Sequence, residues 1–210
     1  MEAIVKMRRS FAVALAFALL GACLVSPAFA ADLPYRTYTG PGPADFSGVE
    51  IGIDAAAALG TTGGATISGP AAGAHVGYNL QNGGLVGGAE ADAIFGSIRT
   101  GSFGAGSFTQ DFLSSARVKG GYAWGNMMAY GTIGWAFSTT SYQDPSGSSN
   151  KTIRGDVIGA GLEYALTRNV SVRGEYLFYD FAGATYTTPF TSKSLSTSTS
   201  LLRVGASLHF

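Results

Sequence analysis

The residues best suited to acid–base chemistry are two histidines, His75 and His209, because an unperturbed imidazole titrates near neutral pH. A hydrolase would need such a histidine beside a carboxylate or a serine. His209 stands one residue from the C-terminus, and His75 lies inside a segment of alternating residues where Glu50 or Glu90 could meet it. We therefore expect His75 to belong to a charge network, and catalysis by His75 is the alternative.

Metal and phosphate chemistry have no motif in this chain. The histidines and the single cysteine, Cys23, do not form a metal-ligand spacing. Residues 101–106 are rich in glycine, but no strand-to-helix pattern surrounds them, so phosphate binding is not indicated. The sequence predicts no cofactor, no metal site and no enzyme activity.

The charged residues of the central segments share one face of an alternating pattern. Six carboxylates and four cations nearly balance, and buried charges should pair because desolvation costs several kcal/mol per ion. These residues form the predicted interior charge network: Glu50, Asp54, Glu90, Asp92, Arg117, Lys119, Glu163, Arg173, Glu175 and Arg203. If the turn at 167–169 is centred on Arg168, Glu163 lies opposite Arg173 on one face.

The elements that must position these residues are strands. Apolar residues alternate with polar or small ones at period two, and no long segment shows a helical period. Eight such segments run over about 49–59, 72–81, 85–97, 112–124, 129–138, 158–166, 170–178 and 202–210. Short turns lie at 82–84, 125–126 and 167–169, and longer polar connections are expected at about 60–71, 98–110, 141–153 and 183–197. Short turns on one side and long loops on the other are typical of a barrel in an outer membrane.

Composition decides which face of the barrel meets water. Charged residues make up 12% of the chain, about half the usual ~25%, while hydrophobic residues make up 46%. In a soluble barrel of the lipocalin or streptavidin kind, the charged face would point outward. Here that face is interleaved with glycine, which suits a crowded interior, so the apolar face should meet lipid and place aromatic girdles at the two interfaces. The formal net charge is zero, which argues against a nucleic-acid partner.

The N-terminus predicts a signal peptide over residues 1–30. A basic start is followed by an apolar run from Phe11 to Val25, and Ala28 and Ala30 form an A-x-A cleavage pattern. An uncleaved anchor and lipidation of Cys23 are the alternatives. Residues 31–45 contain three prolines and read as an extended periplasmic leader before a barrel over 46–210.

Three stretches resemble a known family: ADLP at 31–34, GAGLEYALT at 159–167 running into SVRGEYLFYDF at 171–181, and the C-terminal strand ending in Phe210. They are similar to the alphaproteobacterial outer-membrane β-barrel family, whose members are often labelled porin-family or surface-antigen proteins and are distantly similar to the OmpA barrel. The resemblance implies an assembly signal, read by the barrel-assembly machinery, in Arg203, Gly205, Leu208 and Phe210.

Together these patterns predict an all-β fold: an eight-stranded antiparallel, up-and-down transmembrane β-barrel preceded by a signal peptide. The expected location is the outer membrane, with outer-membrane lipid and lipopolysaccharide as surroundings. The expected function is structural, supporting envelope integrity and surface display. Loop-mediated binding of a host surface or of a ligand such as haem, and a narrow gated channel, are the alternatives.

Overall fold

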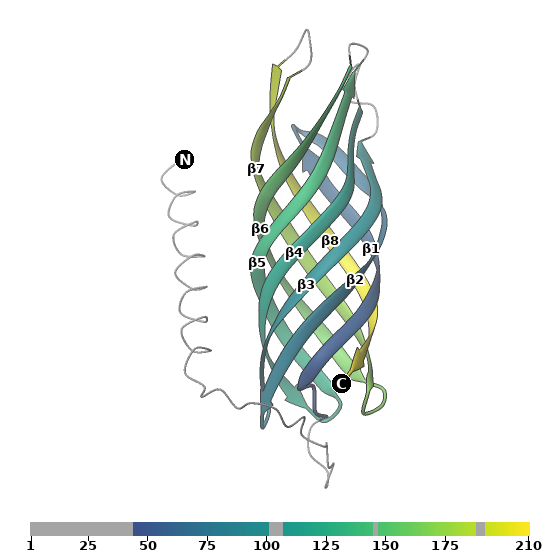
Figure 1. Ribbon diagram of the computed structural model, residues 1–210, viewed down its shortest axis with the longest axis vertical. Helices are drawn as coiled ribbons and strands as arrows, with labels where there is room; N and C mark the ends of the chain where they lie inside the picture. Colours follow the sequence, from purple (N-terminus) through teal and green to yellow (C-terminus); the bar gives the residue numbers. More distant parts are fainter. Residues whose placement is uncertain (1–43, 101–106, 145–146, 188–191) are drawn as a thin grey trace, which may run out of the picture. The chain divides into compact units, whose positions relative to one another are not determined.

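The computed structural model describes residues 44–100, 107–144, 147–187 and 192–210. Its elements are the strands β1 (Gly48–Thr62), β2 (Ala65–Asn82), β3 (Leu85–Thr100), β4 (Ser107–Trp124), β5 (Met127–Asp144), β6 (Gly147–Ala165), β7 (Val170–Thr187) and β8 (Ser192–His209). Each strand pairs antiparallel with the next, and β1 pairs with β8 to close the barrel (Figure 1). No helix within these described ranges is long and apolar enough to cross a membrane.

Closure removes the free edge that an open sheet would leave. Val49 and Phe210 exchange backbone hydrogen bonds of 3.2 and 2.9 Å, which join the start of β1 to the end of the chain. This end of the barrel, called the terminal end, also holds the turns at Gly83 and Gly125. Both glycines adopt positive φ (62° and 54°), a conformation that is readily accessible only without a Cβ. The opposite end is called the distal end.

The described parts of the distal hairpins differ from the prediction of four long polar loops, and residues 101–106, at the centre of the connection expected at 98–110, lie outside the described residues. Residues 60–71 are strand on both sides of a tight turn at Gly63 and Gly64, and β5 and β6 pair as far as Asp144 and Gly147. β7 and β8 pair as far as Thr187 and Ser192. Most of these positions are polar because they extend past the apolar part of the wall, and the neighbouring strand still satisfies their backbone groups.

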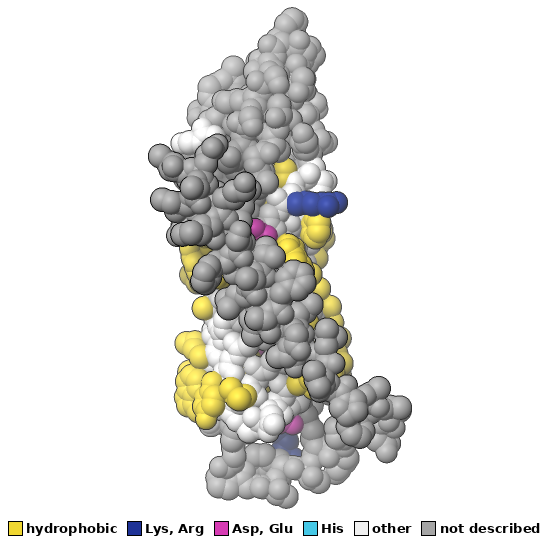
Figure 2. Space-filling view, turned by 90° about the vertical axis from the view of Figure 1, so that its left-hand side faces the viewer, with side chains coloured by type: hydrophobic (Ala, Val, Ile, Leu, Met, Phe, Trp, Pro, Cys, Tyr) yellow, Lys and Arg dark blue, Asp and Glu magenta, His cyan; other side chains and the backbone are white. Residues whose placement is uncertain are grey.

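The outer wall carries the apolar half of each alternating pattern. Figure 2 shows hydrophobic side chains on the described parts of one face. Outward aromatic residues fall into two groups, one near the terminal end and one farther along the strands, and the prediction that they form interfacial girdles stays a prediction. The first group is Tyr78, Tyr122, Trp124, Tyr164 and Phe210, and the second is Phe95, Trp135, Phe137, Tyr176 and Phe178.

The interior of the barrel is filled in layers. Nearest the terminal end is an apolar cluster of Phe46, Val86, Ala123, Met128, Tyr130 and Ala165. Farther along is a second, larger apolar cluster that includes Ile67, Ile94, Ile98, Leu113, Leu177, Tyr179, Phe181 and Leu201. β3, β4 and β6 each contribute to both apolar clusters and to the predicted charged positions. Along each of these strands the charged residues lie between the two clusters. In β3, for example, Glu90 and Asp92 lie between Val86 and Ile94.

Candidate functional site: a charged layer inside the barrel

All ten residues of the predicted charge network point into the barrel and are buried. They come from β1, β3, β4, β6, β7 and β8, and β2 adds His75. Inward and outward positions alternate along each strand, so the period-two pattern of the sequence places them on one side of the wall. We call these ten side chains with His75 and His209 the charged layer.

Glu90 is the residue on which the three arginines converge. Arg173 Nη1 lies 2.6 Å from Glu90 Oε2, and Arg203 Nη2 lies 2.8 Å from Glu90 Oε1. Arg117 also donates to Glu90. These arginines belong to β4, β7 and β8, while Glu90 belongs to β3, so the contacts tie opposite walls of the barrel together.

Two further carboxylates bridge the same arginines. Glu175 accepts from Arg203 Nε at 2.5 Å and from Arg117 Nη1 at 3.1 Å. Asp92 lies 2.7 Å from Arg117 Nη2 and 3.2 Å from Arg203 Nη1. Each guanidinium therefore contacts several carboxylates, an arrangement that its planar fork of donors permits and that a lysine could not reproduce.

His75 is held between two acidic groups. Its Nδ1 lies 2.7 Å from Asp54 Oδ2, and its Nε2 lies 3.0 Å from Ser207 Oγ and 3.4 Å from Glu50 Oε1. Ser207 donates its hydroxyl proton to Glu50 at 3.0 Å, so it must accept from Nε2. Both ring nitrogens of His75 thus have polar partners within the charged layer.

Glu163 lies directly opposite Arg173 in the β6–β7 register, as the turn geometry predicts. The two do not pair with each other in the network. Glu163 Oε1 accepts from Ser171 Oγ at 2.6 Å and lies 3.1 Å from His209 Nε2. Arg173 instead reaches Glu90 and Asp54.

Glu50, Glu163 and His209 form the one group of ligand atoms within 4.8 Å of one another that the described part of the chain offers to a metal ion. Lys119 already supplies a positive charge there, since its Nζ lies 2.8 Å from Glu50 Oε2 and 3.9 Å from Glu163 Oε2. The ammonium would have to leave before a metal could bind.

Phe46 closes the terminal side of the charged layer. Its side chain is 1% exposed and packs edge-on against His209, with ring centroids 6.2 Å apart. Gln81 holds the segment, accepting from Phe46 N at 2.8 Å and donating to Ala44 O at 3.1 Å. Phe46 was not among the predicted site residues, although an isolated aromatic between a proline-rich leader and a strand is a signal that could have identified it.

The distal side of the layer is closed by inward aliphatic and aromatic residues that were also not among the predicted site residues. Ile67, Ile98 and Ile153 lie in segments that were expected to be loops, so their inward direction could not be read. Beyond them, Gln110 donates to Ser138 Oγ at 2.7 Å and accepts from Thr199 Oγ1 at 3.3 Å, which links β4, β5 and β8.

This geometry restricts the chemistry of the site. His75 and His209 are each 3% exposed and lie within a packed layer. Ser171, Glu163 and His209 touch one another, but the serine and the carboxylate both contact the same nitrogen, Nε2. A nucleophilic triad needs the base to use one nitrogen for each partner, so this trio has the geometry of a structural cluster.

Three of the predicted assembly residues lie in β8, and Phe210 follows its last residue. Arg203 and Gly205 face inward, and Arg203 belongs to the charged layer, while Leu208 and Phe210 face outward. The predicted cleavage residues Ala28 and Ala30, the signal peptide and nearly all of the leader lie outside the described residues.

A closed antiparallel barrel with an apolar outer wall and a charged, filled interior defines the class of small outer-membrane β-barrels. Residues 15–210 match the family described as outer membrane protein beta-barrel domain. The chain belongs to this family and is an outer-membrane protein.

Curated relatives come from alphaproteobacteria. The chain is 32% identical over 110 residues to the 22 kDa outer membrane protein of Rhizobium leguminosarum bv. viciae, a match that covers 52% of each chain. It is 32% identical over 139 residues to the 25 kDa outer-membrane immunogenic protein of Brucella canis, covering 66% of this chain and 65% of the relative. The chain thus covers about half to two-thirds of the length of these relatives, which are named as outer-membrane or immunogenic proteins.

Solved structures agree on the fold. Neisserial surface protein A has a TM-score of 0.55 and 17% identity, and the match covers 78% of this chain and 98% of that one. Ail, the attachment invasion locus protein of Yersinia pestis, has a TM-score of 0.51 and 16% identity, covering 79% of this chain and 100% of that one. At this identity the likeness concerns the barrel alone.

Proposed function

We propose that this protein is a structural barrel of the outer membrane that contributes to envelope integrity and displays its distal hairpins at the surface, without catalysis. The observation that carries the proposal is the filled interior, in which a paired charged layer lies between two apolar clusters. Such an interior supports a stable plug, because the paired charges and the apolar side chains fill the described part of the barrel.

The proposed orientation places the terminal end in the periplasm. The start of β1, the end of β8 and the short turns lie at this end. In outer-membrane barrels the short turns face the periplasm. The proposal includes a cleaved signal peptide over 1–30 and recognition of the C-terminal strand by the barrel-assembly machinery. The distal hairpins would then stand among lipopolysaccharide molecules.

Loss of the gene tests the structural role. Cells lacking the protein should become more permeable to detergents and hydrophobic dyes, and expression of the wild-type chain should restore the barrier. A matched variant replaces the β7–β8 hairpin beyond Phe181 and Thr197 with a short turn, which keeps the barrel wall intact. Restoration by this variant supports a structural role, and its failure to restore the barrier would contradict it.

Conductance in planar bilayers tests the plug. The purified barrel should give no discrete conductance steps, whereas a larger porin in the same bilayer serves as the positive control. Reproducible steps from the wild-type barrel would argue for the channel alternative.

A second candidate function is binding through the distal hairpins. It is favoured by strand pairing that continues past the apolar wall to Asp144 and Gly147 and to Thr187 and Ser192. Paired strands could present a firm surface to a host molecule or a ligand. Saturable binding that is lost when the β7–β8 hairpin is shortened, while gel mobility of the folded barrel is kept, would support this function.

A further inference from the structure

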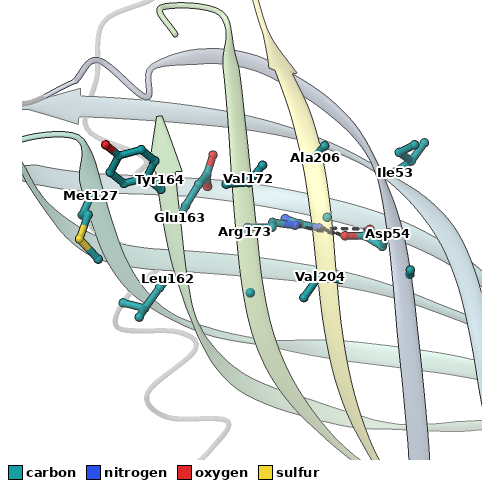
Figure 3. A pocket seen from close by; sticks show the side chains of 13 residues that line it. Ile53, Asp54, Met127, Leu162, Glu163, Tyr164, Val172, Arg173, Val204 and Ala206 are labelled. Atoms are coloured by element: carbon teal, nitrogen blue, oxygen red, sulfur yellow. Dashed lines mark hydrogen bonds and ion pairs between the residues drawn. The ribbon is translucent and has the colours of Figure 1, made fainter. Parts of the chain in front are cut away.

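The outer wall contains a hollow of about 700 Å³ near the terminal end, where β6, β7, β8 and β1 run side by side (Figure 3). The strand register arranges its outward residues in two rows across the wall. One row is Leu162, Gly174, Val204 and Ala55, and the other is Tyr164, Val172, Ala206 and Ile53. In each row, small residues stand next to large aliphatic or aromatic ones.

Gly174 forms the floor of this hollow. A Cβ built at Gly174 would meet no atom within 4 Å, so the space above it is open. Its register partners Leu162 and Val204 are 51% and 62% exposed and rise on either side. The result is an apolar groove between the side chains of neighbouring strands, and we call it the Gly174 groove.

The groove is continuous with the apolar wall of an outer-membrane protein, so hydrocarbon is the medium that it meets. An empty groove would forfeit dispersion contacts along its whole lining. A linear hydrocarbon chain that lies in the Gly174 groove would contact the apolar side chains on both borders of the groove.

The terminal border of the groove offers a place for a polar headgroup. Tyr164 is the last outward residue before Ala165, where β6 ends, and tyrosine suits the boundary between hydrocarbon and water. The β6–β7 turn that follows contains the exposed Arg168, four residues beyond Tyr164 in the sequence. A guanidinium complements a lipid phosphate in charge and in hydrogen-bond donors.

We propose that the Gly174 groove binds one acyl chain of a phospholipid of the periplasmic leaflet, with the phosphate of that lipid near Arg168. The choice of a phospholipid rather than lipid A rests on the orientation in the proposed function. Hydrophobic burial in the groove would supply the affinity, and Arg168 would select an anionic phosphate.

Photocrosslinking tests the site directly. The full-length mature barrel is folded into vesicles containing phosphatidylethanolamine with a diazirine in one acyl chain, and crosslinked peptides are mapped by mass spectrometry. Crosslinks should concentrate on β6, β7 and β8 around Gly174. Gly174→Leu fills the groove and should lower them roughly tenfold, equivalent to losing about 1.4 kcal/mol of binding.

Gly120→Leu is the matched control, because Gly120 also faces outward and a Cβ there meets no atom within 4 Å. It should leave the crosslinks around Gly174 unchanged, and heat-modifiable gel mobility reports that both variants fold. Arg168→Gln should weaken crosslinking by the phospholipid but not by a diacylglycerol carrying the same diazirine.

Equal crosslinking of wild type and Gly174→Leu would overturn the proposal, and so would a protein dimer crosslinked through the groove in place of lipid. A separate labelling experiment tests the periplasmic orientation of the terminal end. Arg168→Cys in intact cells should resist a maleimide that cannot cross the outer membrane. Labelling there would refute the periplasmic orientation even if the groove still bound an acyl chain.

Discussion

Glu163 and Arg173 face each other across the β6–β7 hairpin, yet each binds other partners. A double-mutant cycle of Glu163→Gln and Arg173→Met should therefore give a weak coupling energy of about 0.5 kcal/mol, because the two side chains are connected indirectly, through Glu50 and Lys119. The cycle of Glu90→Gln and Arg173→Met should give about 1–3 kcal/mol, because these two side chains are in contact. Urea unfolding of the barrel in phospholipid vesicles measures both, and equal coupling in the two cycles would contradict the network.

Removal of one arginine from the charged layer should destabilise the barrel strongly. Arg203→Met leaves Glu90, Asp92 and Glu175 with fewer partners, so we expect a loss of about 3–5 kcal/mol in the free energy of unfolding. Arg154→Met is the control, because Arg154 is exposed on the outer wall and contacts the Phe137 ring. It should cost less than about 1 kcal/mol, and similar losses for both variants would be evidence against a paired interior.

We expect the loss of unfolding free energy caused by a charge on the lipid-facing wall to depend on the position of that charge along β8. Val204→Arg, within the apolar part of the wall, should lower the free energy of unfolding by about 2–4 kcal/mol. Ser198→Arg faces the same side nearer the distal end and should cost about 0–1 kcal/mol. Titrations in vesicles measure the difference, which should shrink in a thin detergent micelle that adapts its shape.

Phe46 should contribute to stability although it precedes the first strand. Phe46→Ala empties the space against His209 and is expected to cost about 3–5 kcal/mol. Phe95→Ala changes an outward aromatic that is 63% exposed, so its cost should stay near 1 kcal/mol because lipid can occupy the vacated space. A small effect of Phe46→Ala would mean that the segment 44–47 does not cap the barrel.

Alternation and composition are sufficient to predict the barrel and the side of the wall on which each central residue lies. Alternation at period two fixes side-chain direction once a segment is a strand, and this is why the ten charged positions of the central segments all point inward. The register of Glu163 and Arg173 followed from a local turn for the same reason. The apolar character of the outer wall followed from composition, because so few charges cannot cover a wet surface.

Which charges contact one another depends on the closed barrel and could not be predicted from the alternating pattern. Glu90 contacts arginines from three other strands, and these contacts depend on how closure brings opposite walls together, which no local pattern encodes. The same holds for Phe46, whose burial depends on the path of the chain below the barrel. The distal hairpins were misjudged because polar residues look alike in a loop and in a strand whose backbone is paired by its neighbour.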